Sequence, residues 1–424
     1  MNDGAAIAAE DPAGLRGLAI MIGLALPIQI MGRAAIAGAL IVAFLCFLSL
    51  PGKSFYLKRA FGTVHGPIGF ILLVTFILWL PNTLQSIDPL RSLEAGVRTF
   101  VYVGVATLFW AVMIGNKRIH ALSLRALIVA STIAIIIAIT AETALPELYW
   151  FLHFRGWLSI PLGSNLKPFA SLAVFMIPAL IWAGTRLGGI WVVLAAGNLI
   201  GFIALVWLTY NRAAISGLLG MTLLAAGLAA WSSRSRLIKL ALPVSAIVAF
   251  AGVLIWLYMT RQRPGFGGDW LFPLWLVDFQ RQTIWRFAFK LVEQNFWFGL
   301  GINTINFAPG ANAIIPNTVD KLTMIPSHPH NWMLEVAAET GVFGFLSLLA
   351  AIALSFVRDF RGFFRDNDYA YFVSACMAVG YWLSGLFNFS FWSSWWQMSF
   401  VLTTALFLSQ RSKPVSAGHK GAVY

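Results

Sequence analysis

Long apolar runs alternate with short polar stretches along almost the whole chain. Each run approaches the 20 or so residues that a helix needs to cross the hydrocarbon core of a membrane. The runs expected to span lie at 15–32, 34–51, 66–82, 98–115, 122–141, 168–184, 188–209, 213–231, 238–259, 330–356, 369–387 and 390–409. The pattern predicts an all-α polytopic membrane protein with about 12 transmembrane helices, in which residues 1–424 form a single integral membrane domain.

The composition excludes a large soluble catalytic domain. Hydrophobic residues make up 59% of the chain and charged residues only 11%, whereas ordinary soluble domains contain about 25% charged residues. The longest stretch without a convincing span is 260–328. Cys46 and Cys376 both lie inside apolar runs, a position that does not indicate a disulfide or a metal cluster.

The basic residues distinguish the two sides of the predicted membrane. More than half of the 29 Lys and Arg residues fall on one set of alternate, short loops. The positive-inside rule assigns these loops and both termini to the cytoplasm, with 411–424 as a flexible tail. The loop 260–328, with short amphipathic helices, is then expected to face outward. The net charge of +13 thus reflects membrane orientation, and no nucleic-acid partner is expected.

Charged residues at membrane depth are candidates for function. Arg212, next to Tyr210 in the sequence LTYNRAAISG, interrupts an apolar stretch at the outward turn between two predicted spans. An interfacial arginine that extends to lipid headgroups is the alternative interpretation. The turn is nearly without a loop, however, so Arg212 is expected to stay close to the helix bundle.

The segment 281–297 has helical periodicity but is too polar to span the membrane. At 100° per residue, Arg281 falls in the middle of the apolar arc, in line with Trp285, whereas Arg286 and Lys290 fall on the polar arc. No acid of this helix shares the face of Arg281. We therefore expect Arg281 to be an unpaired cation that binds an anion; a helix-end arginine that reaches back to water is the alternative.

The sequence SHPHNW begins the predicted span at 330–356. Pro329 is expected to open the helix, with Ser327 or His328 as its cap, so that His330 and Asn331 lie in the first turn. The partial positive charge of a helix N-terminus disfavours imidazolium. His330 is therefore expected to be neutral and able to accept a proton near pH 7.

A metal site is the competing interpretation of this segment. The rings of His328 and His330 are expected to diverge, and no Cys or Asp lies nearby in the sequence. Neither a metal nor another cofactor is therefore expected. Glu335 and Glu339 are either acids favoured early in a helix or groups that bind an acceptor, and the sequence gives no role for Lys321.

Three elements occur together in order along the chain. His330-Asn331 is followed after nine residues by Gly341, and after two more by Gly344; small residues one turn apart usually let helices pack closely. Upstream stand Arg212, followed by small residues, and Arg281, four residues before Trp285 and ahead of Gly299 and Gly301. This combination resembles the O-antigen ligase family of bacterial envelope enzymes.

The resemblance implies a GT-C-like glycosyltransferase of the bacterial inner membrane whose active site faces the periplasm. Such ligases transfer a glycan from undecaprenyl diphosphate to lipid A–core, and related polymerases extend a polysaccharide from the same kind of donor. The resemblance implies that His330, Arg212 and Arg281 are catalytic. The other residues expected to bind substrate are Asn331, Arg286, Lys290, His328, Tyr210 and Glu335, and Gly341, Gly344 and Trp285 are expected to be structural.

The chemistry of the residues agrees with this activity. A polyprenyl diphosphate is a good leaving group, and the planar fork of arginine suits phosphate oxygens. The attacking sugar hydroxyl needs a base, for which His330 is the best-placed residue, and direct displacement would invert the anomeric carbon. A lipid or polysaccharide transporter is the main alternative from another class, although the sequence shows no internal halves or helices broken near the midplane. Ligase and polymerase need the same donor site and stay open, with a slight preference for ligase.

Overall fold

The computed structural model describes residues 13–114, 116–153, 162–259, 270–316, 321–366 and 368–409. These residues form helices and no extended strand; an isolated β-bridge joins Ile314 and Thr323. Eight of the described helices are long and apolar enough to cross a membrane, or nine if the bent pair α2–α3 counts as one span. The prediction of an all-α polytopic membrane protein is therefore confirmed.

The helices fall into two groups by length. The eight long apolar helices are α4 (Pro67–Gln85), α5 (Pro89–Met113), α6 (Lys117–Thr143), α8 (Leu162–Leu187), α9 (Ile190–Leu208), α10 (Arg212–Ser232), α11 (Arg236–Met259) and α13 (Trp332–Asp366). The shorter ones are α1 (Ala13–Leu24), α2 (Arg33–Leu48), α3 (Lys53–Gly62), α7 (Pro146–Leu152), α12 (Phe279–Gln294), α14 (Tyr369–Gly385) and α15 (Ser394–Leu408).

The structure does not reproduce the predicted count of twelve spans. The first predicted run divides into α1 and a 3₁₀ turn that begins at Pro27. The second run ends in a bend of 120° between α2 and the helices that continue to His65. The last two runs are present as α14 and α15, but both are shortened by the connection 386–393, named here the α14–α15 loop.

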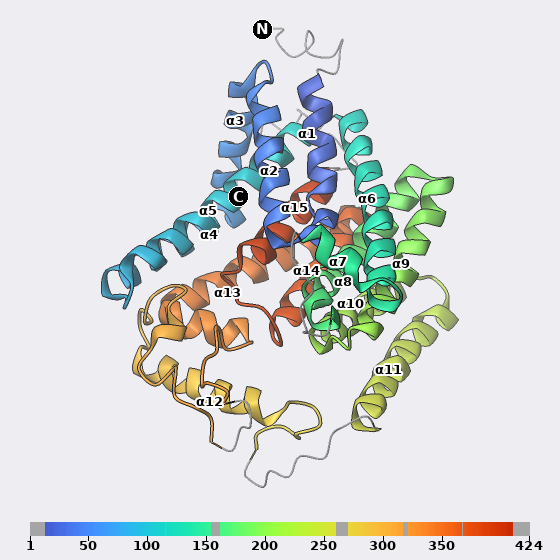
Figure 1. Cartoon of the computed structure of the whole chain (residues 1–424). Coiled ribbons are helices and arrows are strands. Elements are labelled where there is room, and N and C mark those ends of the chain that lie inside the picture. Colours follow the sequence, from blue (N-terminus) through green and yellow to red (C-terminus); the bar gives the residue numbers. More distant parts are fainter. Residues whose placement is uncertain are drawn as a thin grey trace.

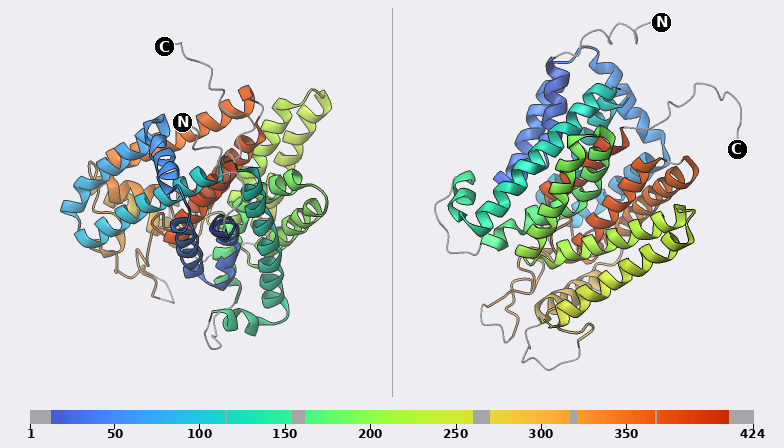
Figure 2. Two further views of the ribbon diagram at one scale, coloured as in Figure 1. Left: turned by 90° about the horizontal axis from the view of Figure 1, so that it is seen from above. Right: turned by 90° about the vertical axis from the view of Figure 1, so that its right-hand side faces the viewer.

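The centre of the bundle is α8, which packs against α6, α9, α10, α14 and α15. Figure 1 shows α4 and α5 extending on one side and α11 standing on the other. In Figure 1 and in the right-hand view of Figure 2, α12 and the segment around it lie at one end of the molecule and the start of α1 lies at the opposite end. The beginnings of α8, α10 and α13 lie at the α12 end, where the predicted site residues are found.

The segment around α12 has a small hydrophobic core of its own. Ile284, Ala288 and Leu291 of α12 are buried against Ile305 and Ile325. The helix expected at 281–297 is thus present, and Ile284 and Ala288, which share the arc of Trp285, face inward. Gln282 departs from the pattern: it lies on the arc of Arg286 and Lys290 but is buried, where it bonds to Phe272 and Val277.

Gly341 breaks α13 instead of packing it against a neighbouring helix. Its φ of +66° is non-helical, and a Cβ there would stand 2.3 Å from the carbonyl oxygen of Trp297. Gly299, with a φ of +75°, fits equally closely against the backbone of Glu339. The expected helix packing holds for Gly344, whose carbonyl accepts a bond of 3.4 Å from Trp79 of α4. The close backbone contacts of Gly299 and Gly341 therefore join the segment that follows α12 to the kink in α13.

Candidate active site

Two predicted cations stand in the first turns of helices. Asn211 caps α10 by accepting a bond from the amide of Ala214, which makes Arg212 the first residue of that helix. Asp278 caps α12 by accepting from the amide of Arg281 at 2.9 Å. A cation is disfavoured at a helix N-terminus because the helix dipole is positive there. Helix stability therefore does not explain these arginines.

The expectation that Arg281 is unpaired is wrong. Its guanidinium lies 3.5 Å from the carboxylate of Asp278, three residues earlier, at the cap just outside the predicted helix. Burial lowers the pKa of Arg281; Asp278 acts in the opposite direction, and Arg212 adds to the lowering. The two arginines come from different helices, and Arg212 lies within electrostatic range of Arg281.

His330 lies just outside α13, because the cap is Asn331 and neither Ser327 nor His328. The Asn331 side chain accepts from the amides of Met333 and Leu334, and the helix begins at Trp332. His330 itself has a φ of +53°, a left-handed conformation that costs of order 1–3 kcal/mol in a residue other than glycine. Strain of this kind, held in place by the surrounding structure, is typical of functional sites.

The hydrogen bond to His330 fixes which ring nitrogen is free. Nδ1 lies 3.0 Å from the carbonyl oxygen of Asn388, which can only accept, so Nδ1 carries the proton and Nε2 has the lone pair. Burial lowers the pKa of His330, and Arg281 lowers it further, against opposing effects of the Asn388 bond and Asp278. Burial and a neighbouring cation therefore both favour the neutral ring that is expected from the sequence.

His328 has no free ring nitrogen. Its Nε2 donates to the same Asn388 carbonyl at 2.8 Å, and its Nδ1 lies 2.8 Å from the hydroxyl of Ser327. Burial and His330 lower its pKa to about 3, with a further contribution from Arg33 against the Asn388 bond. The rings of His328 and His330 are 4.3 Å apart. His328 was expected to bind substrate, but both of its nitrogens already bond to the protein.

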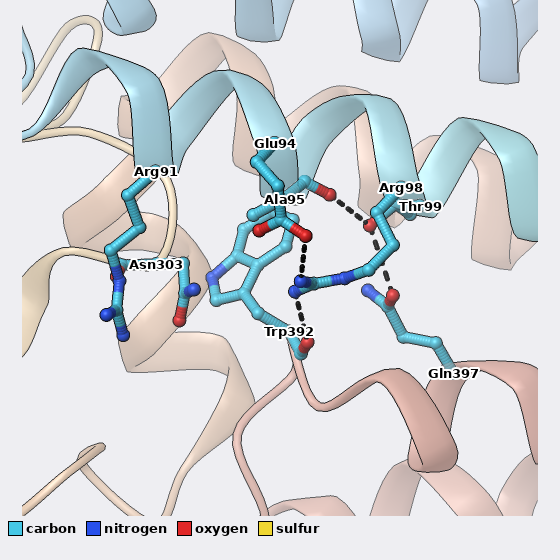
Figure 3. Close-up of polar contacts among 8 residues, drawn as sticks. All are labelled: Arg91, Glu94, Ala95, Arg98, Thr99, Asn303, Trp392 and Gln397. Carbon is cyan, nitrogen blue, oxygen red and sulfur yellow. Dashed lines mark hydrogen bonds and ion pairs between the residues drawn. The ribbon is translucent and has the colours of Figure 1, made fainter. Parts of the chain in front are cut away.

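The α14–α15 loop, which supplies the Asn388 carbonyl, is held from two sides. On one side, Glu335 accepts from the Ser390 hydroxyl at 2.5 Å and from the amide of Phe391 at 2.6 Å. On the other side, Arg98 of α5 donates to the carbonyl of Trp392 at 3.1 Å (Figure 3). Glu335 is 2% exposed. The sequence offered Glu335 as a substrate ligand, whereas both of its oxygens hold this loop.

Glu339 makes a second set of bonds one turn further along α13. Its carboxylate accepts from the amides of Asn303 and Ile305, at 2.9 and 2.8 Å, and from the indole of Trp392. Its oxygens are therefore occupied by protein donors. Among the described residues, no three His, Cys, Asp or Glu side chains gather in a group that could hold a metal ion.

Two features of the site escaped the sequence analysis. The first is Lys167 of α8, which lies within electrostatic range of both Arg281 and Arg212. The second is a chain of polar contacts between the arginines and the histidine: the amides of Asn211 and Asn388 both donate to the buried hydroxyl of Ser171, at 2.9 and 3.4 Å. No local sequence pattern marks either feature, because a lysine near a helix end and single Asn or Ser residues are common in any sequence.

The remaining predicted residues lie around this centre. Trp285 donates to the carbonyl of Pro329 at 3.0 Å and thereby ties α12 to the His-Pro-His segment. Tyr210, with a φ of +47°, lies beside Arg212, whose guanidinium is 5.9 Å from the tyrosine ring centre. Arg286 and Lys290 are exposed, as their polar arc predicted, and Arg286 lies over Trp270.

Comparison with known proteins gives an independent classification. A family model described as O-antigen ligase matches residues 171–349. This stretch of the chain is therefore similar to an O-antigen ligase domain. It contains Arg212, Arg281 and His330, whereas Lys167 and the Asn388 carbonyl lie outside the matched stretch.

Proteins from Rickettsia are among the relatives of this chain. A protein named "putative polysaccharide ligase" from Rickettsia prowazekii is 27% identical over 124 residues, which is 28% of this chain and 29% of the relative. One of the same name from Rickettsia conorii is 26% identical over 128 residues, 30% of each chain. The matches thus cover less than a third of these relatives.

Proposed function

We propose that the protein is a glycosyltransferase that transfers a polysaccharide from undecaprenyl diphosphate to a sugar hydroxyl of lipid A–core, at the periplasmic face of the bacterial inner membrane. What supports the proposal is that Arg212 lies within electrostatic range of Arg281, and Arg281 within range of His330. The Ser171 hydroxyl also accepts from the side-chain amides of Asn211, next to Arg212, and of Asn388, whose carbonyl bonds to His330. Two cations suited to phosphate and a candidate base therefore come from one region of the chain.

In the proposed reaction, the arginines hold the diphosphate and His330 removes the proton. The acceptor hydroxyl approaches Nε2 of His330, because Nδ1 is bonded to Asn388. Its oxygen attacks the anomeric carbon, and the bond from that carbon to the diphosphate oxygen breaks. The electron pair leaves with the diphosphate, where the arginines stabilise the new charge, and the hydroxyl proton moves to Nε2. The anomeric carbon is inverted, and no metal takes part.

The test is reconstitution in proteoliposomes with an undecaprenyl diphosphate-linked glycan and two competing acceptors, lipid A–core and a second lipid-linked glycan. Glycan on lipid A–core supports a ligase, and a lengthened lipid-linked glycan supports a polymerase with the same donor site. Intact donor in the presence of both acceptors, with folded protein, would contradict a transferase and favour a transporter.

His330→Asn is the appropriate inactive control, because asparagine tolerates a positive φ better than alanine does. This variant should keep the fold and lose the ~10²–10⁴-fold that general-base catalysis contributes. Near-normal transfer by His330→Asn would exclude His330 as the base.

A further inference from the structure

Three cations from three helices meet at the candidate site. Arg212 begins α10, Arg281 lies in the first turn of α12, and Lys167 lies in the second turn of α8. The side-chain amide of Asn211, the residue before Arg212, donates to the backbone carbonyl of Lys167 at 2.8 Å. The Asn211 side chain therefore ties the start of α10 to the backbone of Lys167. Lys167 lies within electrostatic range of Arg281 and Arg212, and Arg281 within range of Arg212.

The charges of this cluster can be summed. Among the described residues, Asp278 is the carboxylate that acts on the cluster, through Arg281. The histidines beside it, His328 and His330, have lowered pKa values and are neutral near pH 7. Three cations and one carboxylate leave a net charge of +2. Without Lys167 the sum would be +1.

We propose that Lys167 is the third cation of the donor site and that its charge matches the site to a diphosphate diester. This inference rests on the proposed function. A lipid diphosphate that carries a glycan has one negative charge on each phosphate, −2 in total, because neither phosphate has a second proton to lose. A glycan on a lipid monophosphate carries only one charge, so the cluster prefers the diphosphate.

The different chemistry of arginine and lysine predicts different roles for the three cations. Arginine presents a planar fork with fixed geometry, whereas lysine is a flexible point charge. Arg212 and Arg281 are therefore the orienting groups, and Lys167 supplies charge. Replacement of Lys167 by arginine is expected to be tolerated, whereas replacement of either arginine by lysine is not.

Binding measurements test this without depending on transfer. The full-length protein in nanodiscs is titrated with two fluorescent lipids that differ by one phosphate: an undecaprenyl diphosphate sugar and an undecaprenyl monophosphate sugar. We expect the wild type to prefer the diphosphate lipid. Lys167→Met should weaken diphosphate binding at least tenfold, since the attraction of unit charges across a few ångströms in a partly buried site is substantial. It should weaken monophosphate binding much less, and Lys167→Arg should stay within about threefold of the wild type.

Lys117→Met is the matched control, because Lys117 is an exposed lysine at the start of α6; it should leave both affinities unchanged. If the Lys167→Met variant binds the diphosphate lipid as well as the wild type does, the role of Lys167 is overturned. The proposed function would still stand. An equal loss for both lipids, or a wild type without preference, would overturn the charge match. A wild type that binds neither lipid would contradict the proposed function itself.

Discussion

Substitution of Glu335 can show whether this residue holds the α14–α15 loop in place or contacts the substrate. Its two oxygens accept from the Ser390 hydroxyl and the Phe391 amide, in the loop whose Asn388 carbonyl orients His330. Glu335→Gln can preserve both contacts: the amide oxygen accepts from Phe391, and the amide nitrogen donates to Ser390, whose hydroxyl can rotate. Glu335→Ala leaves both groups without their acceptor.

The expected magnitudes follow from these two bonds. A buried donor that loses its acceptor costs about 1–3 kcal/mol, so Glu335→Ala should destabilise the protein by roughly 2–6 kcal/mol. Its folded fraction should also transfer glycan at least tenfold more slowly, because His330 is no longer held. Glu335→Gln should keep the wild-type Tm and most of the activity.

The assay is a thermal melt in detergent, followed by transfer measured well below the lowest Tm. His330→Asn sets the lower limit of activity. If Glu335→Gln has a normal Tm but is as inactive as Glu335→Ala, the carboxylate acts on the substrate and does not serve to hold the loop.

Three further predictions follow from the site. Arg212→Lys and Arg281→Lys should each reduce transfer at least tenfold through loss of the fork, whereas Arg286→Ala, on the exposed face, should be mild; equal damage at 286 and 281 would refute the arginine pair. Transfer should survive exhaustive chelation, and activity lost in chelator but restored by one divalent ion would overturn the metal-independent mechanism. Burial and Arg281 lower the pKa of His330, so its neutral form persists below the ordinary histidine pKa of about 6.5. The acid limb of the kcat/KM profile should lie below that value, and a limb above it would exclude His330 as the base.

The helical membrane fold was readable from the sequence because apolar runs record the environment of each helix directly. The span boundaries could not be predicted where the chain bends. Pro27 and the turn after α2 interrupt apolar runs that look continuous by composition. For His330, the lowered pKa agrees in direction with the neutral ring expected from the sequence, but the causes in the structure are burial and Arg281. His330 bonds to Asn388, which is 58 residues away in the sequence, and no local sequence pattern predicts a contact at such a separation.

The pairing of Arg281 shows a different limit. The sequence analysis compared charges on one helix face and therefore omitted Asp278, which lies before the first residue of the predicted segment. Helix caps are often acidic because they bond to free amides of the first turn, so a carboxylate just before a helix is a common partner for a cation at its third position. Inspection of the cap would have found this pair from the sequence.

The spacing of the His-Asn and glycine motif acquires a physical meaning in the structure. The nine residues between Asn331 and Gly341 form a straight helix of about 13 Å, at 1.5 Å per residue, between a cap and a kink. Glu335 and Glu339 stand one turn apart on this piece and both bond to the α14–α15 loop. At the beginning of this helical piece, His330 is held by its bond to Asn388. At the end of the piece, Gly299 lies in close contact with the backbone of Glu339. One added residue would rotate the helix by about 100° and turn the carboxylates away from the loop, so the spacing preserves the position of the proposed base.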